Sequence, residues 1–115
     1  MSIAKPRKDA QYVADILRAA GRIATYMAGM KKSEFLDNNV VSDAVLKNLA
    51  FLGEACANIS DGTRKLVPEI DWKGFCGLRN LVVHRYWEED LKIVWDITKK
   101  ELPEVVRRLR SLQIK

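Results

Sequence analysis

Residues 8–30 read KDAQYVADILRAAGRIATYMAGM, and the spacing of their apolar side chains predicts a long helix. These side chains recur at positions i, i+3, i+4 and i+7, which places them on one stripe of an α-helix. Gly29, followed by Lys31 and Lys32, is typical of a helix end. The stripe consists of Val13, Ile16, Leu17, Ala20, Ile23, Ala24 and Met27.

A second long helix with the same period is predicted after a short turn. Ser33 or Asp37 is a candidate cap for that turn, and Ser42 is the predicted cap of the long helix. The pair Asp61 and Gly62 is expected to mark its end. Its apolar stripe consists of Val45, Leu46, Leu49, Leu52, Ala55, Cys56 and Ile59.

Residues 64–70 are predicted to be a connection, because they contain Pro68. Asp71 is well placed to cap a third helix that begins at Trp72. No strand pattern, repeat or low-complexity segment interrupts the helical period.

The last third of the sequence predicts two further helices. Asp90 is expected to cap one over residues 91–99, and Pro103 suits the first turn of another over residues 102–112. The predicted fold is therefore all-α, an antiparallel bundle of four main helices with one short extra helix. At 115 residues the chain is long enough for one core, and we expect a single domain over residues 1–115.

Composition limits the possible partners. The apolar share of 48% and the charged share of 30% are those of a soluble globular protein. A net charge of +5 favours an anionic partner such as nucleic acid, although many basic proteins bind none. Residues 1–7 are polar and charged, with no apolar run behind them, so we expect a cytoplasmic protein without a membrane anchor.

The two cysteines do not predict a metal site. Cys56 and Cys76 have no second cysteine or histidine at ligand spacing, so neither zinc binding nor a disulfide framework is indicated. Both are expected to be reduced core thiols. The sequence shows no cofactor-binding motif, and we expect none to be bound.

Residues 79–86 read RNLVVHRY and are the part of the chain that carries chemistry. Arg79 keeps its charge at any ordinary pH, Asn80 supplies an amide, and His84 titrates near neutrality. Such groups are needed to hold a phosphodiester and to move protons around it. A lone histidine on a helix is more often structural, and the neighbouring Arg79, Asn80 and Tyr86 are what favour a site here.

On an α-helical wheel these residues separate into two sides. Leu78, Leu81 and Val82 would pack into the bundle, whereas Asn80 and His84 would meet one turn apart on another flank. The exposed sector would also hold Arg79, Tyr86, Cys76, Val83 and Trp87. An apolar strip bordered by polar groups is typical of a helix covered by another subunit, so we expect a homodimer.

The octet resembles the R-x4-H-x-Y signature of HepT toxins, a prokaryotic branch of the HEPN superfamily. Residues 49–55 (LAFLGEA) resemble the family's L-x-x-[IL]-G-E-A helix. Residues 68–72 (PEIDW) resemble the segment before the motif helix, and residues 90–95 (DLKIVW) resemble the segment after it. The resemblance extends over roughly residues 10 to 110 in the family's order.

The resemblance implies a metal-independent endoribonuclease toxin that acts as a homodimer with its paired motifs at the subunit interface. His84 would transfer protons, Arg79 would stabilise charge on the phosphorane, and Asn80 would orient His84 or the phosphate. RNA would be the substrate. Because the chain has one histidine, a dimer would supply the two imidazoles that an acid and a base require.

In the family, Tyr86 corresponds to the residue that an MntA antitoxin, a minimal nucleotidyltransferase, AMPylates with ATP as the AMP donor. Spacing alone favours a simpler role for Tyr86, as an amphipathic side chain at the interface. The alternative function is a catalytically inactive HEPN module that binds nucleotide or docks to a partner nucleotidyltransferase.

Two further charged features have structural and functional interpretations. Glu54 lies in a mostly apolar helix, so we expect it to form an ion pair with Arg79 or another basic group. Arg107, Arg108 and Arg110 could hold RNA phosphates, although such a run is more often a solvated helix face.

Overall fold

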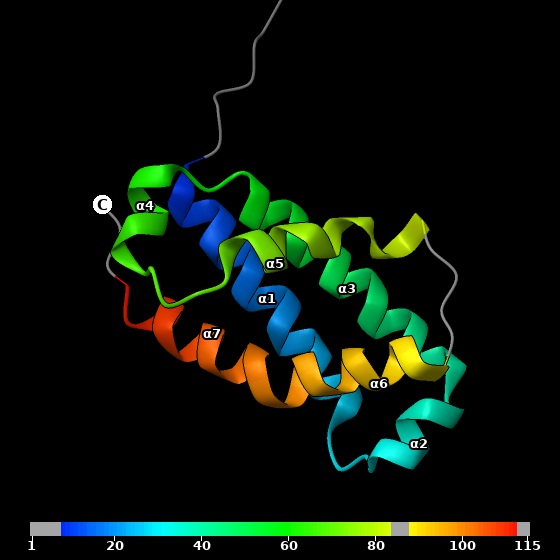
Figure 1. The fold of residues 1–115 in the computed structure, drawn as a ribbon. Coiled ribbons are helices and arrows are strands. Elements are labelled where there is room, and N and C mark those ends of the chain that lie inside the picture. The colour runs from blue at the N-terminus through cyan, green and yellow to red at the C-terminus, as the bar shows by residue number, and fades with distance from the viewer. Residues whose placement is uncertain (1–7, 84–87, 113–115) are drawn as a thin grey trace, which may run out of the picture.

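The computed structural model describes residues 8–83 and 88–112. Within these two ranges the chain is helical and contains no strand, which confirms the all-α prediction. Figure 1 shows the elements, which are α1 (Asp9–Met27), α2 (Lys32–Asp37), α3 (Asn39–Ala57), α4 (Asp61–Leu66), α5 (Trp72–Gly77), the 3-10 helix η1 (Leu78–Val83), α6 (Glu88–Asp96), the π-helix η2 (Ile97–Glu101) and α7 (Leu102–Arg110).

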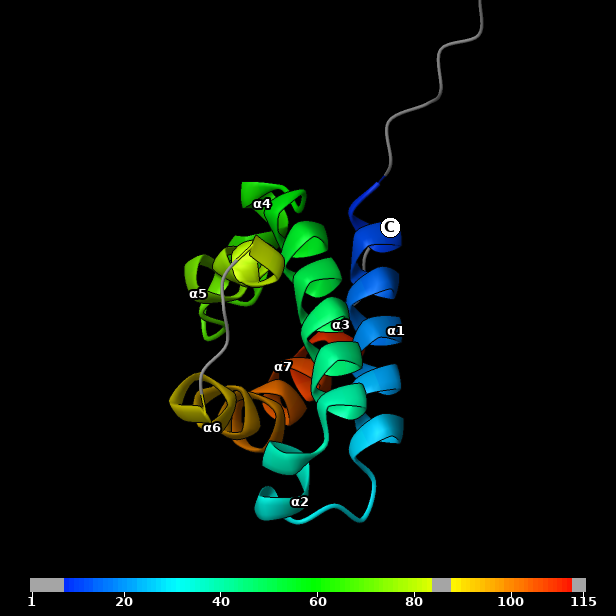
Figure 2. The same cartoon turned by 90° about the vertical axis from the view of Figure 1, so that its right-hand side faces the viewer.

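The long helices α1 and α3 form an antiparallel pair, with α1 on one side of the bundle (Figures 1 and 2). The chain turns back between them at Gly29, whose φ of +74° is a left-handed conformation that glycine adopts without strain. The predicted stripe of α1 is confirmed at five positions, while Leu17 is half-buried and Ala24 is exposed. The five buried positions are Val13, Ile16, Ala20, Ile23 and Met27.

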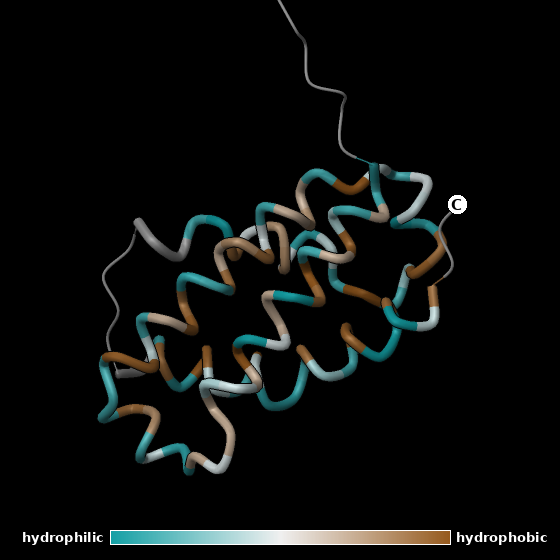
Figure 3. The backbone as a smooth tube through the Cα atoms, turned by 180° about the vertical axis from the view of Figure 1, so that it is seen from behind, coloured by the Kyte–Doolittle hydropathy of each residue, from teal (hydrophilic) through white to brown (hydrophobic). Residues whose placement is uncertain are grey.

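Helices α6, η2 and α7 follow one another as a single rod that packs against α1 and α2 (Figure 1). The rod buries Val94, Leu102, Val105 and Leu109. Seen from behind in Figure 3, brown and teal stretches alternate along the helices, as expected where each helix buries one side. None of the helices in the described ranges is long and apolar enough to cross a lipid bilayer.

The predicted cap of the second long helix is wrong. Helix α3 begins at Asn39, and Asn38 caps it by accepting a hydrogen bond from the backbone N–H of Val41 at 3.1 Å. Ser42 is buried inside the helix, where its hydroxyl donates to the carbonyl of Asn39 at 3.3 Å. Asparagine and serine are both strong caps, and Asn38, which the sequence analysis did not single out, comes four residues before Ser42.

The prediction of a connection over residues 64–70 is also partly wrong. Asp61 and Gly62 do not end the preceding segment but open the short helix α4, which Ser60 caps. The carboxylate of Asp9 accepts hydrogen bonds from the hydroxyls of Ser60 and Thr63. A contact between residues about fifty positions apart therefore stabilises α4, and no local pattern could have revealed it.

Of the two helix starts predicted in the last third of the chain, the one at α7 is confirmed and the one at α6 is wrong. Pro103 lies in the first turn of α7, as expected. Asp90 is not a cap, because α6 already begins at Glu88. Asp90 lies in the first turn instead, where a negative charge favours the helix dipole.

Candidate functional site

Two of the predicted site residues, Arg79 and Asn80, are exposed to solvent. Arg79 and Asn80 follow Leu78 at the start of η1, and both are exposed, whereas Leu78 is buried against the core. His84 and Tyr86 lie outside the described residues, so their predicted roles remain predictions.

The backbone of the motif differs from the predicted α-helix. Residues 78–83 form a 3-10 helix, which has three residues per turn. Gly74 and Gly77 lie in the six-residue helix α5 just before it, and glycine disfavours a continuing α-helix. The α-helical wheel therefore does not describe this stretch.

Gly53 fixes the position of η1 on α3. A Cβ atom at Gly53 would collide with the backbone N of Arg79 and would lie 2.8 Å from the carbonyl O of Phe75. Only a residue without a side chain allows the two backbones to approach so closely. The contact at Gly53 therefore determines where the backbone of Arg79 lies on the surface of the bundle.

Two hydrogen bonds hold the start of α5. Asp71 Oδ1 accepts from the backbone N–H of Gly74 at 3.0 Å, which confirms the predicted cap. The buried ring of Trp72 donates its Nε1–H to the carbonyl of Val67 at 2.9 Å. The α5–η1 segment, which carries Arg79, is thus held at the start of α5 by these hydrogen bonds and at η1 by the contact with Gly53.

Arg64 is a positioning residue that the sequence did not reveal. Its Nη2 donates to the carbonyls of Cys56 at 2.9 Å and Ala57 at 3.3 Å, at the end of α3. The same nitrogen lies 3.5 Å from Cys76 Sγ, and the guanidinium stands 6.0 Å from the ring centroid of Trp72. Arg64 therefore ties the end of α3 to α5. A basic residue shortly after a helix end was the available signal.

Cys56 and Cys76 are free cysteines. Cys56 is fully buried and Cys76 is half-buried. Burial raises the pKa of the Cys56 thiol to about 12, and the neighbouring Cys76 adds to the rise. Cys56 is therefore a protonated core group at neutral pH. No cluster of metal-ligating side chains occurs in residues 8–83 and 88–112.

The prediction that Glu54 forms an ion pair with Arg79 or another basic group is wrong within the described residues. Its side chain is exposed, and its Oε1 accepts a hydrogen bond from Asn58 Nδ2 at 3.3 Å. In the described part of the chain it forms no ion pair with Arg79. A carboxylate in an apolar stretch can point outward because a helix has two sides, and Gly53 rather than Glu54 meets Arg79.

Two arginines of the basic run in α7 form ion pairs with acidic side chains. Arg107 and Arg108 both pair with Glu104, and Arg108 Nη1 also lies 3.4 Å from Glu69 Oε2. These pairs favour the interpretation as a solvated helix face over that as a phosphate-binding patch.

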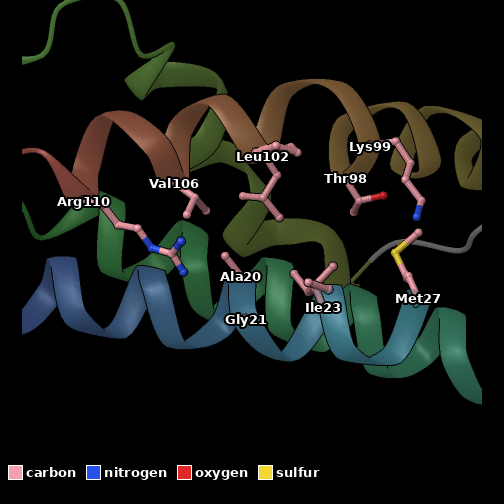
Figure 4. Close-up of a pocket in the computed structure, with 11 residues that line it drawn as sticks. Ala20, Gly21, Ile23, Met27, Thr98, Lys99, Leu102, Val106 and Arg110 are labelled. Atoms are coloured by element: carbon pink, nitrogen blue, oxygen red, sulfur yellow. The ribbon is translucent and has the colours of Figure 1, made fainter. Parts of the chain in front are cut away.

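Two hollows flank α1 on different sides, and neither is lined by Arg79 or Asn80. Figure 4 shows the first, of about 420 Å³, between α1 and the rod of η2 and α7. Ala20, Ile23 and Leu102 contribute to its apolar lining, and Lys99 and Arg110 stand at its ends. The second, of about 370 Å³, lies between α1 and α3.

The all-α bundle agrees with an HEPN-like fold. Residues 16–112 match the family model described as "Ribonuclease HepT-like". The chain belongs to this family.

Relatives are similar over most of their length. In Methanocaldococcus jannaschii, "Putative RNase MJ1380" is 30% identical over 98 residues, which cover 85% of this chain and 90% of the relative. From the same organism, "Putative RNase MJ1216" is 30% identical over 108 residues, which cover 93% and 89%. "Probable ribonuclease HepT" of Thermococcus cleftensis is 27% identical over 107 residues, which cover 93% and 97%. No solved structure matches the chain significantly.

Proposed function

We propose that the chain is a metal-independent endoribonuclease, the toxin of a toxin–antitoxin pair, which acts as a homodimer. The observation that carries the proposal is the exposure of Arg79 and Asn80 on a backbone fixed by Gly53, in a member of the HepT-like ribonuclease family. A fixed backbone matters because transition-state stabilisation depends on groups that are already in place.

In the proposed reaction the ribose 2′-oxygen attacks the adjacent phosphorus and the P–O5′ bond breaks. The products are a 2′,3′-cyclic phosphate and a 5′-hydroxyl. An imidazole of His84 removes the 2′ proton, and a second one, from the partner subunit, protonates the leaving oxygen. Arg79 stabilises the negative charge of the phosphorane, and Asn80 orients His84 or the phosphate by a hydrogen bond.

We further propose that a nucleotidyltransferase antitoxin neutralises the enzyme by modifying Tyr86. The phenolic oxygen would attack the α-phosphorus of ATP and displace pyrophosphate, leaving AMP on the ring. This modification would place negative charge and bulk next to Arg79, where the RNA phosphate has to bind.

Cleavage of RNA by purified protein tests the enzyme proposal. Arg79→Ala and His84→Ala should each lower the cleavage rate by about a hundredfold or more, since each removes a charge-stabilising or proton-transfer group. Arg110→Ala is the matched control, because Arg110 is also an exposed arginine. Fragments should carry cyclic-phosphate ends. Equal fragmentation by wild type and His84→Ala would leave only the alternative of an inactive docking module.

Mass spectrometry tests the modification. Incubation with a nucleotidyltransferase of the antitoxin class and ATP should add AMP to wild type and leave Tyr86→Phe unchanged. The other two tyrosines of the chain, Tyr12 and Tyr26, serve as internal controls. An equal gain of mass in both proteins would place the modification elsewhere.

A further inference from the structure

The hollow between α1 and α3 has the chemistry of a nucleotide site. Its volume of about 370 Å³ falls within the range of small-molecule pockets. Tyr12 and Phe51 supply aromatic rings, Asn48 and Asn58 supply amides, and Arg18 and Arg22 supply guanidinium groups. The hollow of Figure 4, by contrast, is lined mainly by aliphatic side chains between Lys99 and Arg110.

Asn48 provides an independent sign of a missing partner. The residue is only 5% exposed, and its Nδ2 donates to the carbonyl of Ala44 at 2.9 Å. Its Oδ1 is buried and accepts no hydrogen bond within the described residues. Buried acceptors almost always have a donor, so the unpaired Oδ1 beside the hollow indicates a partner that the described residues do not supply.

Phe51 offers a surface on which a base can stack. Its side chain is 54% exposed although it lies in the middle of α3, and Lys47 Nζ stands 5.7 Å from its ring centroid. Proteins that bind single-stranded RNA use exposed aromatic rings in this way, with nearby amides that read the edge of the base.

The charges around the hollow fit one nucleotide better than a long polyanion. Arg18 is held by Asp15 at 3.1 Å, whereas Arg22 forms no ion pair in the part of the chain that the structure describes. Glu54 also lines the hollow, so the positive charge is local to Arg22. One cation beside an aromatic ring matches one phosphate beside one base.

The hollow is also close to the motif segment. Figure 2 shows α3 between α1 on one side and the α5–η1 segment on the other. Gly53 faces η1, while its neighbours Phe51 and Glu54 line the hollow. The two surfaces are therefore separated by about one helix diameter, roughly 10 Å.

We propose that the hollow between α1 and α3 is a subsite that binds one nucleotide of the RNA, next to the cleaved bond. Phe51 stacks on the base, and Arg22 binds a phosphate. This inference rests on the proposed ribonuclease function, since it assigns a role to a second part of the same RNA path.

Binding of RNA in the His84→Ala background tests the subsite without cleavage. Fluorescence anisotropy with short oligoadenylate should show about tenfold weaker binding for Phe51→Leu, because a stacking interaction is lost. Phe51→Trp should restore binding. Tyr26→Leu is the matched control, since Tyr26 is an exposed aromatic residue outside the hollow. Oligouridylate should bind more weakly than oligoadenylate, because the smaller uracil ring stacks less well on Phe51, and Phe51→Leu should reduce that difference.

Several outcomes would overturn the subsite. One is equal RNA affinity for Phe51→Leu and Tyr26→Leu, and another is the absence of RNA binding by the parent protein. A third is dissociation of a dimer by Phe51→Leu in analytical ultracentrifugation, which would make the hollow a protein interface.

Cleavage assays separate this inference from the proposed function. RNA that wild type and Phe51→Leu cleave at equal rates and at the same sites would remove the subsite and keep the ribonuclease. RNA that binds through Phe51 but is not cleaved by wild type would remove the ribonuclease and keep the subsite.

Discussion

The α1–α3 pair and the α5–η1 segment hold their shape by different means. Helices α1 and α3 each have 19 residues and are held by continuous apolar stripes. The α5–η1 segment is short and partly 3-10, and it depends on a glycine contact, a cap and the side chain of Arg64. The stability of the fold and the position of the candidate site are therefore determined by different residues and can be changed separately.

The largest loss of stability is expected in the α1–α3 pair. Leu49 is fully buried, so Leu49→Ala should leave a cavity and lower the free energy of unfolding by about 2–5 kcal/mol. Urea denaturation followed by circular dichroism measures the loss. Cleavage by the fraction that stays folded should be nearly normal. A selective loss of cleavage would show that the two regions are not independent.

Gly53→Ala should produce the opposite pattern. The new methyl group would push η1 away from α3, which should lower the free energy of unfolding by about 1–3 kcal/mol. The protein that stays folded should also cleave RNA much more slowly, because Arg79 is displaced. Gly21→Ala is the matched control, because a Cβ there meets no atom within 4 Å. That control should be neutral or stabilising by up to about 1 kcal/mol. Normal cleavage by Gly53→Ala would contradict the role assigned to this contact.

A smaller effect is expected at the start of α5. Asp71→Ala removes the cap and should lower stability by about 1 kcal/mol, while Asp71→Asn should retain most of it. Thermal denaturation of the two variants measures the difference. Hydrogen exchange of the α5 amides should rise more than that of α1 if the two regions respond separately, and a uniform rise would contradict this.

The smallest effect is expected from Asp9, and it should depend on pH. Hydrogen bonds from Ser60 and Thr63 lower the pKa of this carboxyl below its usual value. A lowered pKa in the folded state stabilises the protein above the unfolded value of about 3.9, and this stabilisation disappears as the pH falls through the folded pKa. Asp9→Asn should therefore be less stable than wild type at neutral pH, and the gap should close in acid. A constant gap in pH-dependent urea titrations would rule out this linkage.

The sequence predicted the regular part of the molecule well, because a helical period depends only on neighbouring residues. The stripe of α3, the cap at Asp71 and the first-turn Pro103 are confirmed, and the stripe of α1 is confirmed at five of its seven positions. The start of α3 was misplaced because Asn38 and Ser42 are both good caps, and only the packed bundle selects between them.

The candidate site was predicted less completely, because its geometry depends on contacts between distant residues. The assignment of Arg79 and Asn80 to the site stays a prediction, and the sequence includes Gly53 in a family segment without showing what that glycine contacts. The 3-10 form of residues 78–83 and the bridging role of Arg64 follow from tertiary packing. The hydrogen bonds from Ser60 and Thr63 to Asp9 also follow from tertiary packing.

The π-helix η2 sets the rotational phase between α6 and α7. In its wide turn the N–H of Leu102 reaches back five residues to the carbonyl of Ile97, so the turn contains one residue more than an α-helix would. Deleting one residue here would therefore convert the wide turn into an ordinary α-helical turn and keep Leu109 in the interior, whereas deleting one residue within α7 would turn the rest of that helix by about 100° about its axis. Along this rod, η2 is thus the place where the chain can lose one residue without changing which side chains face the core.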